Sequence, residues 1–132
     1  MKKLPVLRGG KLFALEPDDG GKERFDELVR SADVRVERIV STGQASPPGF
    51  WYDQAEDEFV ILLTGAAELR FETGDRRVRL DPGDWIDIPA GARHRVDFTQ
   101  ADPPTVWLAV YRPAGRGRTR AVGSATSGSS GQ

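Results

Sequence analysis

The sequence predicts a mainly all-β fold, a small antiparallel sandwich or barrel that one short helix precedes. The chain of 132 residues contains 15 glycines and 9 prolines, more than a helical protein usually carries. Between these turn residues, several short segments alternate apolar and polar side chains, as half-buried strands do. Their regular spacing is typical of a sandwich or small barrel.

The length and composition limit what the protein can be. A chain of this length fits one domain with its own core. The 19 basic and 20 acidic residues nearly cancel, which disfavours nucleic acid and membrane surfaces as partners. Cysteine is absent, and no apolar run approaches the roughly 18 residues of a membrane span. We therefore expect a cytoplasmic protein.

Residues 1–33 predict an N-terminal arm followed by a short helix, both packed on the barrel. Two short apolar pieces, 4–7 and 12–15, surround a pair of glycines and indicate edge strands or an extended arm. Phe25, Leu28 and Val29 then recur at the three-and-four spacing of one helical face. One or two helical turns fit that spacing.

Residues 34–112 predict the barrel itself. The first strand begins near Val34, but the phase changes at Ile39 and Val40, so this strand either contains a bulge or is buried on both faces. The run 58–63 is almost wholly apolar, as in a strand covered on both sides. A hairpin with a turn at 73–75 follows, and further strands precede and follow His94.

Residues 113–132 predict a disordered tail. Nine of these 20 residues are Gly or Ser, three are Arg, none is acidic, and only Val122 is a sizeable apolar group. Such a segment buries too little surface to offset the entropy lost on ordering.

Two segments of the predicted barrel resemble the paired motifs of the cupin superfamily. In the second motif, Gly83, Pro89, Gly91 and His94 follow one another at the family's spacing, with Phe98 in place of a frequent asparagine. In the first motif, Gly49, Glu58 and Gly65 are present, but its two histidines are missing. The resemblance implies a double-stranded β-helix, a jelly-roll barrel with a ligand site inside one mouth.

The alternation of side chains places a candidate site inside that barrel. If Val96 and Phe98 face the interior, His94 does so too, and Glu58 shares the parity of Val60 in a buried strand. A carboxylate and an imidazole are costly to bury unless a cation, a mutual hydrogen bond or ordered water accompanies them.

A divalent metal is one prediction for this site. The cupin resemblance implies three histidines and a glutamate as ligands, but this chain has a single histidine. Its histidine positions fall on Trp51 and Asp53 or, with the shorter spacing, on Tyr52 and Gln54. Asp53, Glu58 and His94, completed by Gln54 or water, can hold Zn, Mn, Fe(II) or Mg. The alternative is a vestigial, metal-free pocket in which Glu58 and His94 share a hydrogen bond.

The remaining candidates line the pocket or mediate assembly. Trp51, Tyr52, Val60, Val96 and Phe98 are expected around a small-molecule ligand, although aromatic rings are more often core or dimer contacts. We expect a homodimer, formed by strand addition at an exposed edge. The functional hypothesis is a cupin with a small-molecule site, either a metal-dependent enzyme of unknown reaction or a metal-free binding or sensing module.

Overall fold

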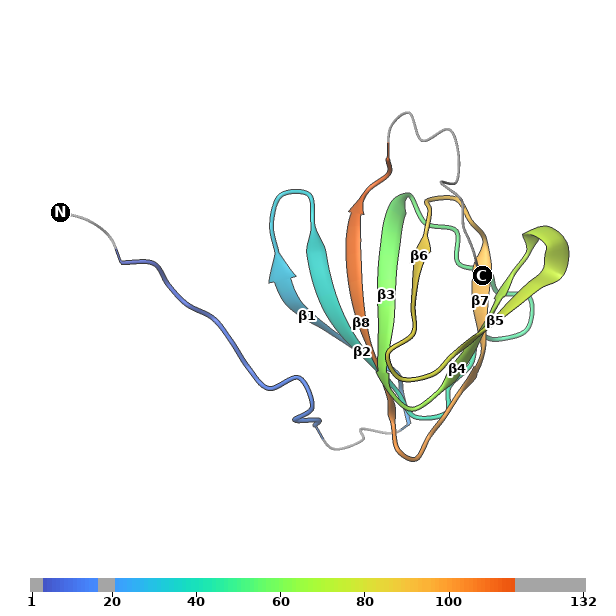
Figure 1. Cartoon of the computed structure of the whole chain (residues 1–132), viewed down its shortest axis with the longest axis horizontal. Coiled ribbons are helices and arrows are strands. Elements are labelled where there is room, and N and C mark those ends of the chain that lie inside the picture. Colours follow the sequence, from blue (N-terminus) through green and yellow to red (C-terminus); the bar gives the residue numbers. More distant parts are fainter. Residues whose placement is uncertain (1–3, 17–20, 116–132) are drawn as a thin grey trace.

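The computed structural model describes residues 4–16 and 21–115, and nearly all regular secondary structure in these residues is β (Figure 1). Eight strands are joined by turns, with one 3-10 turn, η1, at Thr73–Asp75. The strands are β1 Arg24–Arg30, β2 Arg35–Ser41, β3 Glu56–Thr64, β4 Ala67–Phe71, β5 Arg76–Leu80, β6 Trp85–Ile88, β7 His94–Thr99 and β8 Thr105–Pro113. No helix in the described residues has the length and apolar character that a membrane span requires.

The strands form two antiparallel sheets that face each other (Figure 1). One sheet has five strands in the order β1-β2-β8-β3-β6, and the other has three in the order β5-β4-β7. Strands that are neighbours in space are often distant in sequence, as β3 and β8 are, which is typical of a jelly-roll barrel. The expected β-barrel architecture is therefore confirmed.

Alternation along each strand separates an inner face from an outer face. On β3 the inward side chains are Glu58, Val60 and Leu62, and on β8 they include Trp107 and Tyr111. The core between the sheets consists of these inner-face side chains together with those of the three-stranded sheet, among them Ile39, Ala67, Leu69, Leu80, Ile88 and Ala109.

The predicted N-terminal helix is wrong: residues 24–30 form β1, which pairs antiparallel with β2. Glu27 pairs with Glu37 and Val29 with Val36, so Leu28 is an extra residue in a β-bulge. A bulge shifts the alternation of inward and outward side chains by one residue. This shift gives Phe25, Leu28 and Val29 the spacing of residues on one helical face. The described part of the arm, residues 4–16, forms no strand. Arg38 binds its carbonyl oxygens at Leu12 and Ala14, but its first part runs away from the sheets instead of packing on the barrel (Figure 1).

β2 and β3, the two strands for which burial on both faces was predicted, differ in how much of each face is buried. Ile39, Val40 and Ser41 are all buried, so β2 is buried on both faces at its end, while its first four residues are half-buried. β2 pairs with β8 without a register shift and needs no bulge. In β3, by contrast, Phe59 and Ile61 on the outer face are only half-buried. The expected two-sided burial of β3 is therefore incomplete within a single copy of the chain.

The last strand, β8, stops at Pro113, and β1 at 24–30 joins the same sheet as β8 ahead of the predicted barrel segment 34–112. The hairpin turn at Thr73–Asp75 is also confirmed, with Gly74 at a positive φ of 73°. Of the predicted disordered tail, residues 116–132 lie outside the described residues.

Candidate functional site

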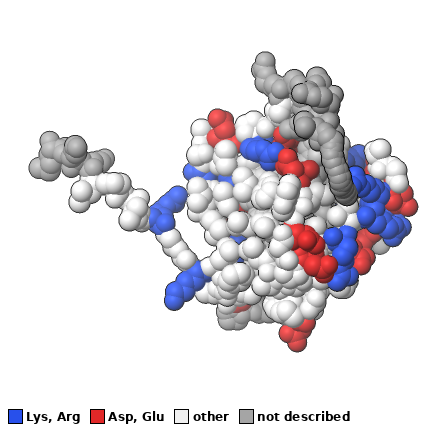
Figure 2. Space-filling view, in the orientation of Figure 1, with Lys and Arg blue, Asp and Glu red and all other residues white. Residues whose placement is uncertain are grey.

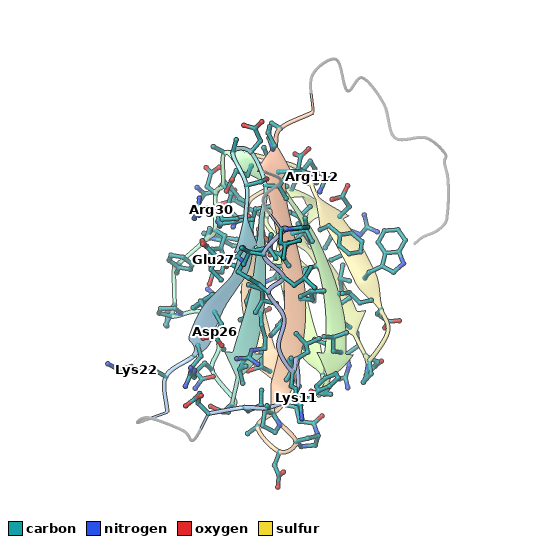
Figure 3. The ribbon with its side chains drawn as sticks, turned by 90° about the vertical axis from the view of Figure 1, so that its left-hand side faces the viewer. Lys11, Lys22, Asp26, Glu27, Arg30 and Arg112 are labelled. Atoms are coloured by element: carbon teal, nitrogen blue, oxygen red, sulfur yellow. The ribbon has the colours of Figure 1, made fainter. Side chains whose placement is uncertain are left out.

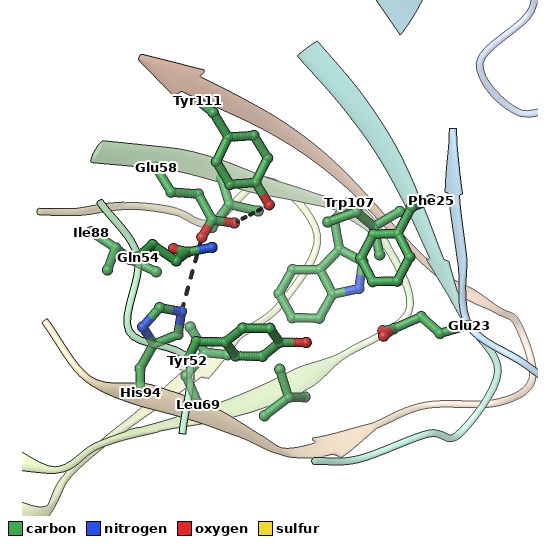
Figure 4. A pocket seen from close by; sticks show the side chains of 13 residues that line it. Glu23, Phe25, Tyr52, Gln54, Glu58, Leu69, Ile88, His94, Trp107 and Tyr111 are labelled. Atoms are coloured by element: carbon green, nitrogen blue, oxygen red, sulfur yellow. Dashed lines mark hydrogen bonds and ion pairs between the residues drawn. The ribbon is translucent and has the colours of Figure 1, made fainter. Parts of the chain in front are cut away.

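A chamber between the two sheets contains the candidate site (Figure 4). It encloses about 60 Å³, enough for several water molecules or for one end of a small organic molecule. Its wall is mostly apolar and aromatic, with a few polar groups. The lining residues are Glu23, Phe25, Ile39, Tyr52, Gln54, Glu58, Val60, Leu69, Ile88, His94, Val96, Trp107 and Tyr111.

Glu58 supplies a buried carboxyl group to this chamber. It sits near the start of β3, where it pairs with Ile88 of β6 on one side and Tyr111 of β8 on the other. The Tyr111 hydroxyl lies 3.3 Å from Oε2 as a donor, and the Gln54 side chain also hydrogen-bonds the carboxyl group. Burial outweighs these bonds and raises the pKa of Glu58 to about 7. Both protonation states are therefore populated at neutral pH.

His94 faces the chamber from the other sheet. Its backbone forms an isolated bridge with Tyr52, in which each residue's N–H donates to the other's carbonyl. Nδ1 lies 2.8 Å from the Ala92 carbonyl oxygen, which can only accept, so Nδ1 carries the proton. Burial lowers the pKa of His94 despite this bond. The imidazole is thus neutral at neutral pH, with the lone pair of Nε2 directed into the chamber.

The structure brings these two groups to face each other. Nε2 of His94 lies 3.9 Å from Oε1 of Glu58 (Figure 4). This distance is too long for a direct hydrogen bond but short enough for one ligand atom or water molecule to contact both groups. A protonated carboxyl group as donor and an imidazole nitrogen as acceptor can then act on the same bound molecule.

The donor set does not fit a divalent metal centre. Asp53, one of the predicted ligands, is exposed at the surface, where its carboxylate lies 3.7 Å from the Arg93 guanidinium. The chamber supplies one imidazole, one carboxyl group and the Gln54 amide. In the described part of the chain, no group of three or more His, Cys, Asp or Glu side chains is placed to hold a metal ion. Catalytic zinc sites use three protein ligands, most of them charged or imidazole donors.

The predicted pocket residues divide into two groups. Tyr52, Val60 and Val96 line the chamber as expected, together with Gln54. Trp51 and Phe98 lie outside it.

Trp51 is half-buried on the loop before β3, within 6.0 Å of the Arg70 and Arg95 guanidinium groups. Phe98 is outside the chamber because Val96 pairs with Leu69 and Phe98 with Glu68, which leaves Asp97 as a bulge. This bulge turns Phe98 to the surface, where 40% of it is exposed.

Several chamber residues were not predicted from the sequence. Trp107 and Tyr111 share the parity of Ala109 in the last apolar run, a signal that was available. Glu23 and Phe25 belong to the segment expected to be helical, and in a helix the alternation of a strand does not indicate which side chains face the core.

Glu23 lies at the far side of the chamber from Glu58 (Figure 4). The Ser41 hydroxyl donates to it and in turn accepts from the Trp107 indole N–H. Burial raises the pKa of Glu23, and the Ser41 bond opposes this rise. The chamber therefore carries a second carboxyl group whose pKa is raised by burial.

A second hollow adjoins the chamber. It has a volume of about 180 Å³ and shares Glu23, Tyr52 and Val96 with the chamber wall. Its other residues belong to the loop before β3: Gln44, Ala45, Ser46, Pro47 and Phe50. Arg95 holds this loop through bonds to the carbonyl oxygens of Ser46, Pro47 and Phe50.

Comparisons with known proteins agree with this architecture. A protein described as a proposed mannose-6-phosphate isomerase from Ralstonia eutropha JMP134 is 44% identical, with a TM-score of 0.77 over 82% of this chain and 100% of that one. A cupin superfamily protein from Desulfitobacterium hafniense DCB-2 has a TM-score of 0.66 at 20% identity, over 85% of this chain and 96% of that one. An RmlC-like cupin from Desulfovibrio desulfuricans has a TM-score of 0.65 at 15% identity, over 82% and 98%.

No functionally curated protein matches this sequence. The cupin domain family does match it, over residues 37–111. That span runs from β2 to β8 and contains both Glu58 and His94. The two opposed sheets, the chamber between them and this match lead to one conclusion: the chain belongs to the cupin family.

Proposed function

We propose that the chamber binds a small organic molecule and exchanges protons with it through Glu58 and His94, without a metal ion. The observation that carries this proposal is the 3.9 Å separation of Glu58 Oε1 and His94 Nε2 inside a mostly apolar chamber. The two residues come from opposite sheets, so the fold holds them facing each other.

The protonation states of the pair suit acid–base chemistry at neutral pH. General acid–base groups work best when their pKa is near the working pH, and the pKa of Glu58 is about 7. The protonated Glu58 can donate a proton to the substrate while the neutral His94 accepts one from it at Nε2. Transfer of both protons in the opposite direction returns Glu58 and His94 to their starting protonation states. Moving a proton between adjacent carbons of a hydroxy-carbonyl compound needs such a donor and acceptor on one substrate.

The lining favours a ligand without negative charge. Among the described residues that line the chamber, two carry carboxyl groups and none is Lys or Arg. Arg35 stacks 4.0 Å above the Tyr111 ring, but Glu37 and Glu56 bind its guanidinium group. A phosphate ester would therefore meet carboxyl groups and no free cation in the chamber. This argues for an unphosphorylated substrate, unlike the one in the name of the Ralstonia protein.

The adjoining hollow extends the space for such a ligand. Tyr52 and Glu23 stand at the boundary between the two spaces, and the hollow is lined by neutral loop residues. A ligand with its reacting end beside Glu58 can place its remaining polar groups against the loop.

Proton exchange with solvent tests the proposal directly. The wild type, Glu58→Gln and His94→Gln are incubated in D₂O with D-mannose, D-fructose or D-mannose 6-phosphate, and proton NMR follows exchange next to the carbonyl group. We expect exchange with an unphosphorylated sugar that both substitutions slow by about a hundredfold. Exchange that is equal in the wild type and Glu58→Gln would overturn the proposal.

A thermal-shift screen of neutral sugars and small amines separates catalysis from binding alone. A ligand that raises the melting temperature of the wild type but not of His94→Gln, without any exchange, would indicate a binding or sensing module.

Elemental analysis tests the metal hypothesis separately. About one equivalent of Zn, Mn, Fe or Mg in the wild type, lost in His94→Ala and Glu58→Gln, would replace the metal-independent proposal by a metal site.

A further inference from the structure

Glu23 is a polar group of the chamber that the proton transfer at Glu58 and His94 does not use. Figure 4 shows its carboxyl group directed toward the chamber, on the opposite side from Glu58. Glu23 also lines the adjoining hollow, so a ligand that extends from the chamber into the hollow passes this carboxyl group. Its position suits recognition of the outer end of a ligand.

The carboxyl group of Glu23 has one oxygen to offer to a ligand. The side chain is half-buried, and the Ser41 hydroxyl donates to Oε2. Oε1 accepts no hydrogen bond from the residues that the structure describes. A carboxylate in a mostly apolar wall with a single neutral donor lacks both hydrogen bonds and countercharge.

The cations that flank Glu23 in the sequence are directed elsewhere. Lys22 points away from the sheets into solvent (Figure 3), and Arg24 binds Asp26 at 3.3 Å. Among the described residues that line the chamber and the hollow, none is Lys or Arg. Burial accordingly raises the pKa of Glu23, against the opposing effect of the Ser41 bond. A cation supplied by a ligand therefore meets no competitor from these residues.

Acidic groups on the outer surface of the barrel have a different environment. Over the three-stranded sheet, on the right of Figure 2, acidic and basic side chains are intermixed. Glu68 binds Arg79 there, and Glu72 binds Arg93. Their charges are neutralised within the chain, whereas that of Glu23 is left for a ligand to neutralise.

Three aromatic rings line the chamber together with Glu23. Trp107 is linked to Glu23 through Ser41, whose hydroxyl accepts from the indole N–H and donates to the carboxyl group. Phe25, two residues after Glu23, also lines the chamber (Figure 4). Burial and, after it, the charge of Glu23 raise the pKa of Tyr52, so the Tyr52 hydroxyl lies within reach of that charge. Aromatic rings beside a carboxylate attract an ammonium group through the negative faces of the rings.

We propose that Glu23 binds a protonated primary amine, and that the ligand of the chamber is a small polyhydroxylated amine, such as an amino sugar, whose amine lies at the end remote from Glu58 and His94. This inference rests on the proposed function in one respect, that the chamber binds a small organic molecule. The ammonium group supplies the countercharge that Glu23 lacks and donates to its free oxygen, and the aromatic rings stabilise the same positive charge.

Isothermal titration calorimetry with three probes of equal length tests the preference for a cation. D-Glucamine, D-glucitol and D-gluconate carry a cationic, a neutral and an anionic group at the same end of a six-carbon polyol. We expect the wild type to bind D-glucamine at least about tenfold more tightly than D-glucitol, and D-gluconate most weakly. Equal affinities for D-glucamine and D-glucitol would overturn the inference, as would a wild type that does not bind D-glucamine.

Three variants locate the amine. Glu23→Gln keeps an oxygen that accepts from Ser41 but removes the charge, so the preference for D-glucamine over D-glucitol should disappear. Glu68→Gln removes an exposed carboxylate from the other sheet and is the matched control, which should retain the preference. Glu58→Gln should retain it too. A preference that survives Glu23→Gln, or that either of the other two variants abolishes, would contradict binding of the amine at Glu23.

Binding of the amine and proton transfer fail independently. D-Glucamine and D-glucitol have no carbonyl group, so their binding does not depend on proton exchange. A preference for D-glucamine that needs Glu23, in a protein that exchanges protons with no sugar in D₂O, would overturn the proton transfer and support the amine site. Exchange with a sugar in a protein that binds D-glucamine and D-glucitol equally would support the proton transfer and overturn the amine site.

Discussion

A methyl group at Gly65 would stand 2.6 Å from Cα of Thr105. Gly65 follows β3 with a φ of 83°, and Thr105 begins β8 on the neighbouring strand. The Thr105 hydroxyl also bonds the backbone of Ala66 and Gln100, so it cannot move away without losing these contacts. The turn after β3 therefore needs glycine both for its backbone conformation and for its space.

Gly65→Ala is expected to lower the free energy of unfolding by about 3 kcal/mol or more, since strain and overpacking add. Gly83→Ala is the matched control, because its φ of 92° is similar but no atom lies within 4 Å of the added Cβ. It should cost only about 1–2 kcal/mol. Urea denaturation measures both, and equal costs would show that the contact with Thr105 is unimportant.

The raised pKa of Glu58 predicts a pH-dependent stability. The folded state holds the Glu58 proton up to a pH of about 7, whereas a free glutamate releases it near 4.5. The stabilisation is therefore complete below pH 4.5 and is lost as the pH rises through 7, by up to about 3 kcal/mol. Denaturation of the wild type and Glu58→Gln between pH 4.5 and 8 isolates this contribution.

The lowered pKa of His94 acts in the opposite direction, since its stabilisation is lost as the pH falls. Because both proteins contain His94, its effect largely cancels in the difference. A wild-type stability that runs parallel to that of Glu58→Gln would mean that Glu58 titrates like a free glutamate.

Ser41→Ala is expected to destabilise the protein by about 1–3 kcal/mol, because it leaves the buried Trp107 indole N–H without its acceptor. It also removes the Ser41 bond to Glu23 and so should raise the pKa of that carboxyl group further. Thermal denaturation measures the first effect. The exposed Ser31→Ala is the control and should change stability by less than about 0.5 kcal/mol. A similarly small change for Ser41→Ala would show that water replaces the hydroxyl.

Arg95→Ala is expected to loosen the loop that walls the outer hollow. Its guanidinium group binds three carbonyl oxygens of that loop, at Ser46, Pro47 and Phe50. Hydrogen exchange of the amides at 46–52 should accelerate by about tenfold, with a smaller change in the strands. Arg93→Ala removes a neighbouring arginine that binds Glu72 and Asp53 instead. The idea fails if both variants exchange alike.

Much of the fold could be predicted because turns interrupt the chain at short intervals. Gly65, Gly74 and Gly83 all adopt positive φ values between strands that the sequence indicated. The wrong prediction of a helix at 25–29 and the wrong prediction that Phe98 faces the interior have the same cause, a β-bulge. The bulge at Leu28 imitated helical spacing, and the bulge at Asp97 reversed the side on which Phe98 emerges. The alternation of apolar and polar residues in a sequence does not show where a bulge inserts an extra residue.

The candidate site was predictable where it lies on regular strands. Glu58 and His94 meet as their parity indicated. Asp53 and Trp51 lie on the loop before β3, where side-chain direction depends on tertiary contacts such as the ion pair with Arg93. Glu23, the second carboxyl group of the chamber, was not predicted because its segment was expected to be helical.

The alternation of β3 has a consequence for how this protein can vary. Glu58 and Phe59 are adjacent in the chain, yet they serve opposite sides of the same wall. Inserting one residue before them would turn the carboxyl group to the outer face of the sheet and the phenyl ring into the cavity. Side chains on the inner face of β3 can therefore be substituted without changing those on the outer face, and the reverse. An insertion or deletion within the strand, by contrast, changes both faces.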